Sequence, residues 1–112
     1  MDCIFCKITA GEIPSKKVYE DEKILAFHDI QPVAPVHVLV IPKVHMDSLN
    51  EINSANADYV SHLMQKLPEI AASQNLAGGY RVVTNIGNDG RQSVQHLHFH
   101  VLGGRKLGIE LG

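Results

Sequence analysis

The chain has 112 residues, enough for one compact domain that buries roughly two-thirds of its unfolded surface without disulfides or metals. Ten lysine and arginine residues against twelve aspartate and glutamate residues give a formal net charge of −2, which argues against a dedicated nucleic-acid-binding protein. No apolar run approaches the roughly 20 residues of a transmembrane helix, and the first residues lack the basic-then-apolar order of a signal peptide. We therefore expect a cytoplasmic protein.

The first half of the chain is predicted to form a short helix followed by three strands. Residues 2–9 carry apolar side chains at helical spacing, with Asp2 as a candidate N-cap. Residues 18–20 and 24–28 are predicted as two short strands on either side of an acidic turn. Residues 37–41 are apolar and β-branched, which is typical of a buried strand.

The second half is predicted to form one long helix and two strands. Apolar residues recur at i, i+3, i+4 and i+7 from residue 54 to about residue 74, which indicates a helix with one buried face. Residues 80–84 and 97–102 are predicted as strands. Short connections favour antiparallel pairing, because parallel strands need long crossovers. We expect an α+β fold, a mainly antiparallel five-stranded sheet with one long helix and a short N-terminal helix, in a single domain over residues 1–112.

Three of the seven histidines stand in a row, His96, His98 and His100, and alternate with apolar residues. On a strand, alternate side chains face the same side of the sheet. The pattern therefore predicts three imidazoles on one face and the apolar residues between them on the core face. Mutual repulsion of charged imidazoles should keep most of them neutral near pH 7. A neutral imidazole can bind a metal, accept a proton or attack an electrophile.

Two kinds of site fit this row, a metal held by histidines on a strand or a set that uses histidine as nucleophile, acid and base. The residues just upstream favour the second. Asn85, Gln92 and Ser93 donate hydrogen bonds without charge, while Gly87 and Gly90 let the backbone approach an anion, so the segment suits a phosphate beside an attacking group. The chain has neither a P-loop nor a dinucleotide fingerprint, so a Mg-nucleotide kinase or a hydride transferase is not indicated.

Residues 96–102, His-Leu-His-Phe-His-Val-Leu, resemble the signature of the histidine triad (HIT) superfamily, and the similarity covers nearly the whole chain. It is closest to the Hint branch of histidine triad nucleotide-binding, protein-kinase-C-inhibitor-like proteins. The resemblance implies the HIT-like fold and a purine nucleotide ligand of the AMP or GMP type. It also implies hydrolysis of nucleoside 5′-phosphoramidates or related nucleotidyl adducts at the α-phosphate, through a nucleotidyl-histidine intermediate.

The resemblance implies roles for individual residues. His98 would be the nucleophile, and His100 would contact the phosphoryl oxygens. His37 would lie behind His98, orienting it and tuning its basicity. The phosphate and the departing group would be contacted by polar residues of the preceding loop: Ser93, Asn85 and Gln92. Arg91 stands where a glycine is common in relatives and adds a positive charge near the phosphate.

The same resemblance implies a nucleoside pocket. Asp29 would hold the ribose hydroxyls, although it could equally cap the end of a strand. The pocket for the purine base would be lined by apolar side chains: Ile4, Phe5, Ile8, Phe27 and Ile30. Of these, Ile4 and Ile8 fit plain core positions equally well.

Cys3 and Cys6 form a Cys-x-x-Cys pair, for which two reduced cytosolic thiols are the simplest interpretation. A thioredoxin-like redox pair is disfavoured because that motif follows a strand, and the expected compartment disfavours a disulfide. The remaining interpretation is half of a closed Cys₂His₂ zinc site. Resemblance to superfamily members with two N-terminal cysteines implies a structural zinc held by Cys3, Cys6, His45 and His96.

Three functions follow from these alternatives: a phosphoramidase-type hydrolase, a nucleotide-sensing module with little turnover, and a histidine metalloenzyme. The resemblance favours the first. It also implies a homodimer, paired through the long helix and the adjoining sheet edge to give one continuous sheet. Neither nucleic acid nor a membrane is expected as a partner.

Overall fold

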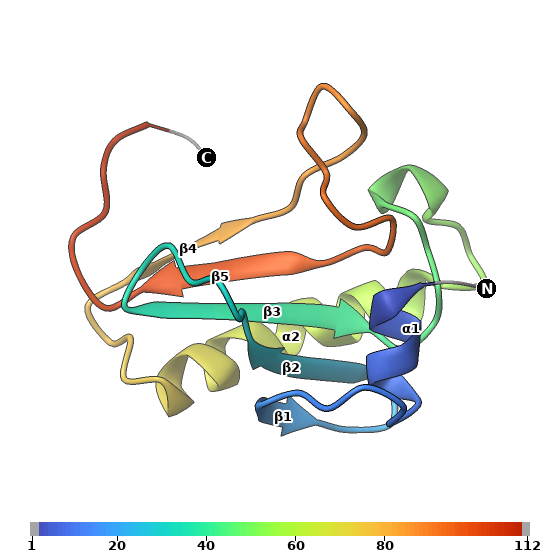
Figure 1. Cartoon of the computed structure of the whole chain (residues 1–112), viewed down its shortest axis with the longest axis horizontal. Coiled ribbons are helices and arrows are strands. Elements are labelled where there is room, and N and C mark those ends of the chain that lie inside the picture. Colours follow the sequence, from blue (N-terminus) through green and yellow to red (C-terminus); the bar gives the residue numbers. More distant parts are fainter. Residues whose placement is uncertain (1–2, 111–112) are drawn as a thin grey trace.

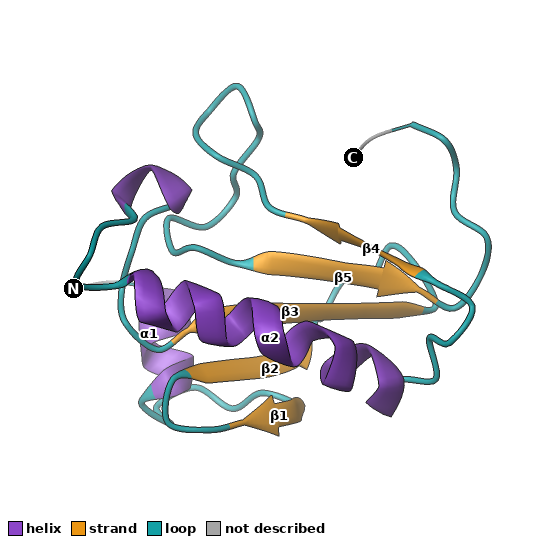
Figure 2. Cartoon of the chain, turned by 180° about the vertical axis from the view of Figure 1, so that it is seen from behind, coloured by secondary structure: helices purple, strands orange, loops and turns teal. Residues whose placement is uncertain are grey.

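The structure is a computed structural model that describes residues 3–110 (Figure 1). In chain order its elements are α1 (Ile4–Thr9), β1 (Lys17–Glu20), β2 (Ile24–His28), β3 (Val36–Pro42), the 3₁₀ turn η1 (Leu49–Glu51), α2 (Ala57–Ser73), β4 (Tyr80–Val83) and β5 (Phe99–Gly103). Within the described residues the strands form one five-stranded antiparallel sheet in the order β1-β2-β3-β5-β4. The two helices lie on opposite faces of the sheet (Figures 1 and 2). The predicted fold class is confirmed.

The elements differ from the predicted ones mainly at their ends. The candidate cap Asp2 lies outside the described residues, and Cys3 caps α1 instead, with its Sγ accepting from the Cys6 amide at 3.3 Å. The long helix begins three residues later than predicted, because Asn53 and Asn56 bond to nearby backbone amides and hold a turn there. Among residues 3–110 no helix is both long enough and apolar enough to span a membrane.

The sheet separates two apolar clusters, since successive side chains of each strand point to opposite faces. One cluster packs between the sheet and α2 and includes Leu97, Phe99 and Val101, the apolar residues that alternate with the histidines. Figure 2 shows α2 lying across this face of the sheet. The other cluster lies on the α1 face and includes Phe5 and Ile8. The histidine row therefore faces α1, as the alternation predicts.

A single carboxylate ties the β1–β2 turn to α2. Asp21 accepts hydrogen bonds from the Tyr19 hydroxyl at 2.7 Å and from His62 Nε2 at 2.6 Å. It also accepts from the backbone amides of Lys23 and Ile24 at 2.8 and 3.0 Å. Partial burial raises the pKa of Asp21, but these bonds outweigh burial and hold the pKa well below its usual value. Because His62 belongs to α2, the carboxylate fastens the long helix to the sheet.

We predict that Asp21→Asn destabilises the protein by about 2 kcal/mol at pH 7, because an amide cannot accept as many charge-assisted bonds. The carboxyl titrates lower in the folded chain than its unfolded value of about 4. Its contribution is therefore complete above pH 4 and is lost as the pH falls through the folded pKa. Urea unfolding at pH 7 and pH 3 should show the difference from wild type shrinking at pH 3, whereas Asp89→Asn in an exposed loop should match wild type. An unchanged difference at the two pH values would contradict this role.

Candidate functional site

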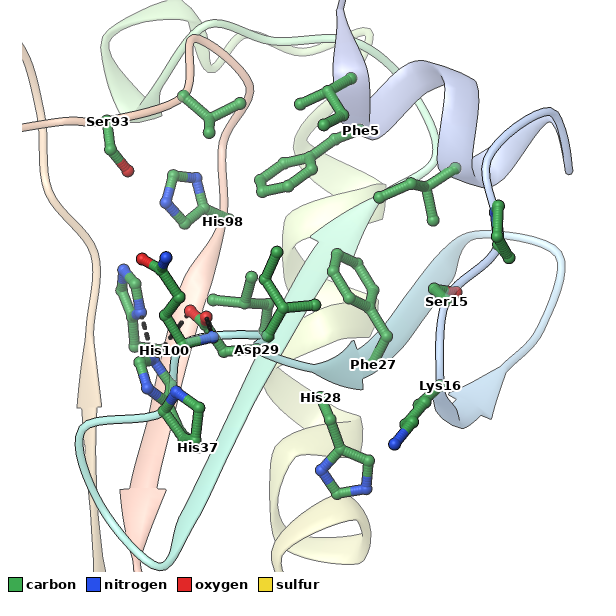
Figure 3. A pocket seen from close by; sticks show the side chains of 18 of the residues that line it. Phe5, Ser15, Lys16, Phe27, His28, Asp29, His37, Ser93, His98 and His100 are labelled. Atoms are coloured by element: carbon green, nitrogen blue, oxygen red, sulfur yellow. Dashed lines mark hydrogen bonds and ion pairs between the residues drawn. The ribbon is translucent and has the colours of Figure 1, made fainter.

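A cavity of about 1170 Å³ opens on the α1 face of the sheet (Figure 3). Its walls come from α1, residues 14–16 before β1, the end of β2, the loop between β2 and β3, β3 itself, and the segment from residue 93 to residue 100. It brings together most of the residues predicted to react or to bind nucleotide: Ile4, Phe5, Ile8, Phe27, Asp29, Ile30, His37, Ser93, His98 and His100. Asn85 and Gln92 are not part of this lining.

His98 is held in one tautomer by the backbone. Its Nδ1 lies 2.7 Å from the carbonyl oxygen of His96. A carbonyl only accepts, so Nδ1 carries the proton and Nε2 keeps its lone pair. Phe5 packs edge-on against the ring, with 5.2 Å between centroids, and the Ser93 hydroxyl points towards the ring in Figure 3. Burial lowers the pKa of His98, so the imidazole is neutral at pH 7.

A second chain of hydrogen bonds fixes the tautomers of His37 and His100. The Val33 amide donates to His37 Nδ1 at 3.2 Å, so the proton of this neutral ring lies on Nε2. His37 Nε2 then donates to His100 Nδ1 at 2.9 Å, which leaves the proton of His100 on its Nε2. The result is an N–H donor on a cavity-lining side chain that carries no formal charge.

This arrangement corrects the predicted place of His37. The residue contacts His100, with 5.1 Å between ring centroids, and not the nucleophile candidate His98. The register explains the difference: Leu39 of β3 pairs with His100 of β5, so His37 lies diagonally next to His100 on the same face. The orienting partner of His98 is a backbone carbonyl.

Burial keeps the whole histidine row uncharged near neutral pH. It lowers the pKa of His100 to about 4, with further lowering by His98 and His37. It also lowers the pKa of His37, against the opposing effect of Asp29, whose Oδ2 lies 3.4 Å from His37 Nε2. Burial lowers the pKa of His96 in the same way. These directions agree with the predicted neutrality of the triad.

Asp29 has a structural bond in addition to its place in the cavity. Its Oδ1 accepts from the Gln31 amide at 2.8 Å, which confirms the interpretation of Asp29 as a cap at the end of β2. The carboxylate also lines the cavity (Figure 3), so its predicted contact with a ribose remains compatible with the fold.

The apolar wall of the cavity combines core and rim residues. Phe5, Ile8 and Phe27 are buried and belong to the α1-face cluster, so they serve the core and the cavity at once. Ile30 is 94% exposed and Ile4 is 46% exposed, although both line the cavity. Such exposure at a cavity rim is typical of side chains that a ligand covers.

The loop that precedes the triad is organised by Gln92. The Gln92 side chain accepts from the Gly87 amide at 2.9 Å and donates to the carbonyl oxygens of Val94, at 2.9 Å, and Asp47. These bonds occupy the amide group, so the structure gives Gln92 a role in shaping the loop and does not support a direct phosphate contact. Arg91 has a φ of 61°, in the left-handed region that favours glycine.

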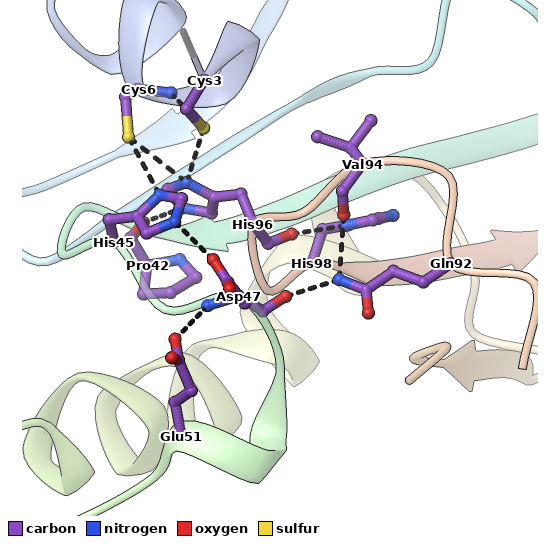
Figure 4. Close-up of polar contacts among 10 residues, drawn as sticks. All are labelled: Cys3, Cys6, Pro42, His45, Asp47, Glu51, Gln92, Val94, His96 and His98. Atoms are coloured by element: carbon purple, nitrogen blue, oxygen red, sulfur yellow. Dashed lines mark hydrogen bonds and ion pairs between the residues drawn. The ribbon is translucent and has the colours of Figure 1, made fainter. Parts of the chain in front are cut away.

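The cysteine pair and two histidines come together beside the cavity (Figure 4). The ligand atoms of Cys3, Cys6, His45 and His96 all lie within 4.8 Å of one another. Cys3 Sγ is 3.2 Å from His96 Nδ1, and Cys6 Sγ is 3.3 Å from His45 Nδ1. Tetrahedral zinc with bonds of about 2.3 Å to sulfur and about 2.0 Å to nitrogen separates such ligands by about 3.5 Å. The donor set and its spacing fit a closed zinc site.

The surroundings orient both imidazoles of this cluster for metal binding. His45 Nε2 donates to Asp47 Oδ1 at 2.8 Å, and His96 Nε2 donates to the Pro42 carbonyl oxygen at 2.9 Å. The lone pairs of both Nδ1 atoms therefore face the thiols. Burial, together with the adjacent Cys3, raises the pKa of the Cys6 thiol to about 11.

The three triad histidines lie in different surroundings. His96 belongs to the thiol cluster, and His100 belongs to a second cluster with His37 and Asp29. Within residues 3–110 no candidate metal cluster contains two of the triad histidines. The interpretation of the row as three ligands of one metal is therefore not supported.

Sequence reasoning missed two groups that hold the histidines. Thr84 Oγ1 donates to the His98 carbonyl oxygen at 2.8 Å, and the Val33 amide sets the tautomer of His37. A backbone amide leaves no signal in a sequence. A threonine at the end of a predicted strand is too common to single out.

An antiparallel α+β fold with neutral, alternating histidines at a cavity defines a histidine-triad protein, and comparisons with known proteins agree. The family model described as "Scavenger mRNA decapping enzyme C-term binding" matches residues 2–108. Protein HitA of Neisseria gonorrhoeae is 47% identical over 102 residues, which cover 91% of this chain and 95% of that protein. The chain therefore belongs to the HIT family.

Solved structures lead to the same assignment. A histidine triad protein from Clostridium difficile superposes with a TM-score of 0.93 at 53% identity, covering 99% of this chain and 97% of the other. A HIT family hydrolase from Clostridium thermocellum also has a TM-score of 0.93, at 44% identity, covering 98% and 96%. Membership of the Hint branch remains a prediction from the sequence.

Proposed function

We propose that this HIT protein is a cytoplasmic hydrolase that binds a purine nucleotide and cleaves nucleoside 5′-phosphoramidates or related nucleotidyl adducts at the α-phosphate. The observation that carries the proposal is the hydrogen bond from His98 Nδ1 to the His96 carbonyl oxygen, 2.7 Å long, which leaves Nε2 free to attack. The similar protein from Clostridium thermocellum is named a HIT family hydrolase, which supports hydrolysis as the reaction class.

In the first step His98 Nε2 attacks the α-phosphorus, and the bond from phosphorus to the leaving group breaks. The N–H of His100 Nε2 donates to a phosphoryl oxygen and stabilises the charge that develops there. An amine leaves only when protonated: the Ser93 hydroxyl beside His98 would donate a proton to the departing nitrogen and take a replacement from solvent water. The product of this step is a nucleotide bonded to His98 Nε2, together with the free amine.

In the second step water attacks the same phosphorus and the bond to His98 Nε2 breaks. The ring, positively charged in the adduct because Nδ1 keeps its proton, becomes neutral again. The attacking water releases a proton to solvent, and the nucleoside monophosphate leaves. Because His98 Nδ1 stays bonded to the His96 carbonyl, the ring keeps its orientation through both displacements. The adduct splits one difficult displacement into two easier ones.

The rest of the cavity fits a nucleoside. The apolar wall of Phe5, Ile8 and Phe27 suits a purine face, and the exposed Ile30 at the rim would be covered by it. Asp29 is the carboxylate in the lining that can accept from the ribose hydroxyls.

We predict that His98→Ala lowers turnover of a nucleoside 5′-phosphoramidate by several orders of magnitude, because no neighbouring group replaces the attacking imidazole. The dissociation constant for AMP or GMP should stay close to that of wild type, since the apolar wall and Asp29 are intact. Steady-state kinetics and calorimetric titration measure the two quantities.

His62→Ala, on α2 and outside the cavity, serves as the matched control. It loses the bond to Asp21 and with it some stability, but it should keep wild-type turnover at a temperature where both variants are folded. Wild-type turnover in His98→Ala would contradict the catalytic role. Nucleotide binding without turnover in the wild type would instead establish the alternative function, a nucleotide-sensing module.

We also propose that Cys3, Cys6, His45 and His96 hold one structural zinc ion. Four protein ligands close the site, so the ion would pin the N-terminal helix to the segment before β5 and would leave no position for a catalytic water. The oriented Nδ1 atoms of His45 and His96, each fixed by a bond at Nε2, support this assignment.

We predict that His96→Ala lowers the zinc content per chain and the melting temperature, whereas His98→Ala keeps both near wild type. Metal analysis after dialysis and thermal melts with and without added zinc measure these effects. The two variants should thus differ in kind, one losing metal and stability, the other losing turnover. Full zinc content and an unchanged melting temperature in His96→Ala would refute the zinc site.

A homodimer remains our proposal for the assembly. β4 is an edge strand, and Tyr80 and Val82, each 39% exposed, lie on the sheet face that carries α2. Met64 on α2 is 40% exposed. α2 packs on β1, β2 and β3, so these apolar side chains remain available to a second copy of the chain.

We predict that the wild-type protein sediments as a dimer at micromolar concentration and that Val82→Glu shifts it to a monomer, because the substitution places a charge in the proposed interface. Lys17→Glu, on the opposite edge strand β1, should leave the dimer intact. Sedimentation velocity distinguishes these species, and a wild-type monomer would remove the proposal.

A further inference from the structure

The candidate nucleophile lies just outside the part of the sheet that strand pairing fixes. β5 begins at Phe99, and its pairing with β3 ends at the Val40–Phe99 pair. Its pairing with β4 ends at the Val83–His100 pair. The backbone of His98 therefore has no ladder bond to define its position, although attack on phosphorus requires that the imidazole be placed to a fraction of an ångström.

Hydrogen bonds outside the ladder replace the missing pairing. The Leu97 amide donates to the Met46 carbonyl oxygen at 2.6 Å, one residue before His98. The Thr84 hydroxyl donates to the carbonyl oxygen of His98 itself at 2.8 Å. The first bond joins two backbone groups, so Thr84 supplies the side chain that holds the His98 peptide.

Thr84 is the first residue after β4, the edge strand of the sheet. Continued antiparallel pairing beyond Val83 and His100 would place it opposite Phe99. The ladder instead stops, and the threonine side chain bonds to the backbone one residue further along. A side chain thus extends the connection between the two strands to the residue that bears the nucleophile.

We infer that Thr84 is a positioning residue for the phosphoryl-transfer step, acting through the His98 backbone and not through the substrate. The hydroxyl fixes the peptide plane that follows His98, while the His96 carbonyl fixes its ring, so the two bonds together set the direction of Nε2. The inference rests on the proposed function, since it assigns Thr84 a share in the reactivity of His98.

The test compares Thr84→Val, Thr84→Ser and Ser73→Ala with wild type. Valine keeps the shape of threonine without the hydroxyl, and serine keeps the hydroxyl. Ser73 on α2 donates to the Ile70 carbonyl oxygen at 2.7 Å, so Ser73→Ala loses the same kind of bond far from the cavity. Single-turnover rates, KM for a nucleoside 5′-phosphoramidate and melting temperatures are measured for each.

We expect Thr84→Val to lower the single-turnover rate about tenfold, because small misplacements of a reacting group are costly, with KM unchanged within about twofold. Thr84→Ser should recover most of the rate, and Ser73→Ala should keep it. A wild-type rate in Thr84→Val overturns the inference. So does an equal loss of rate in Ser73→Ala, or a rate loss in Thr84→Val that Thr84→Ser does not recover, because either would reflect general stability.

A separate readout distinguishes failure of this inference from failure of the proposed function. If wild type shows no turnover, the proposed function fails, and imidazole NMR signals then test the placement of His98 directly. Thr84→Val should shift the His98 ring signals while Ser73→Ala leaves them unchanged. Unchanged His98 signals in Thr84→Val would overturn the positioning role without reference to catalysis.

Discussion

The hydrogen bond between His98 Nδ1 and the His96 carbonyl oxygen is the interaction on which the account of this site depends. It decides which ring nitrogen carries the proton and which nitrogen is free to react. The same residue, His96, places its own side chain in the cysteine cluster (Figure 4). The cluster and the candidate nucleophile therefore share one stretch of backbone, and a metal bound by His96 would stiffen the carbonyl that orients His98.

The proposed reaction also requires uncharged imidazole rings in the cavity, and burial keeps these rings uncharged. Burial removes the water that would stabilise a charged imidazole, and this loss lowers the pKa of His37, His98 and His100. Each neutral ring can then act as donor at one nitrogen and acceptor at the other. The chain from the Val33 amide through His37 to His100 uses this property to present an N–H donor on a side chain that lines the cavity.

Much of the fold could be predicted because its sequence signals are local. Apolar periodicity identified α2, and β-branched runs identified β3. The alternation around His98 correctly predicted that the three imidazoles lie on one face of the sheet, even though residues 96–98 lie outside the paired strand. Leu97 is buried in the cluster beneath α2, so the histidines on either side of it face the opposite side of the sheet. The predicted start of α2, at residue 54, was wrong because asparagine side chains bind the backbone amides there and hold a turn.

The site was less predictable because it depends on contacts between distant segments. His37 bonds to His100 and not to His98, a consequence of strand register that spacing alone does not reveal. Gln92 holds its own loop, since its amide finds backbone partners at Gly87, Val94 and Asp47. The Cys3, Cys6, His45 and His96 cluster, by contrast, followed from resemblance, and the fold brings its four members together.

The most direct test of the central claim, that His98 Nε2 is the attacking atom, is to trap the covalent intermediate. Wild-type protein is mixed rapidly with a nucleoside 5′-phosphoramidate and quenched at alkaline pH, where a bond between phosphorus and an imidazole nitrogen survives. Mass spectrometry of the digested protein should show the added nucleotide on the peptide that contains His98, and on that residue. A nucleotide attached to a different residue, or turnover with no adduct at any time point, would contradict the account.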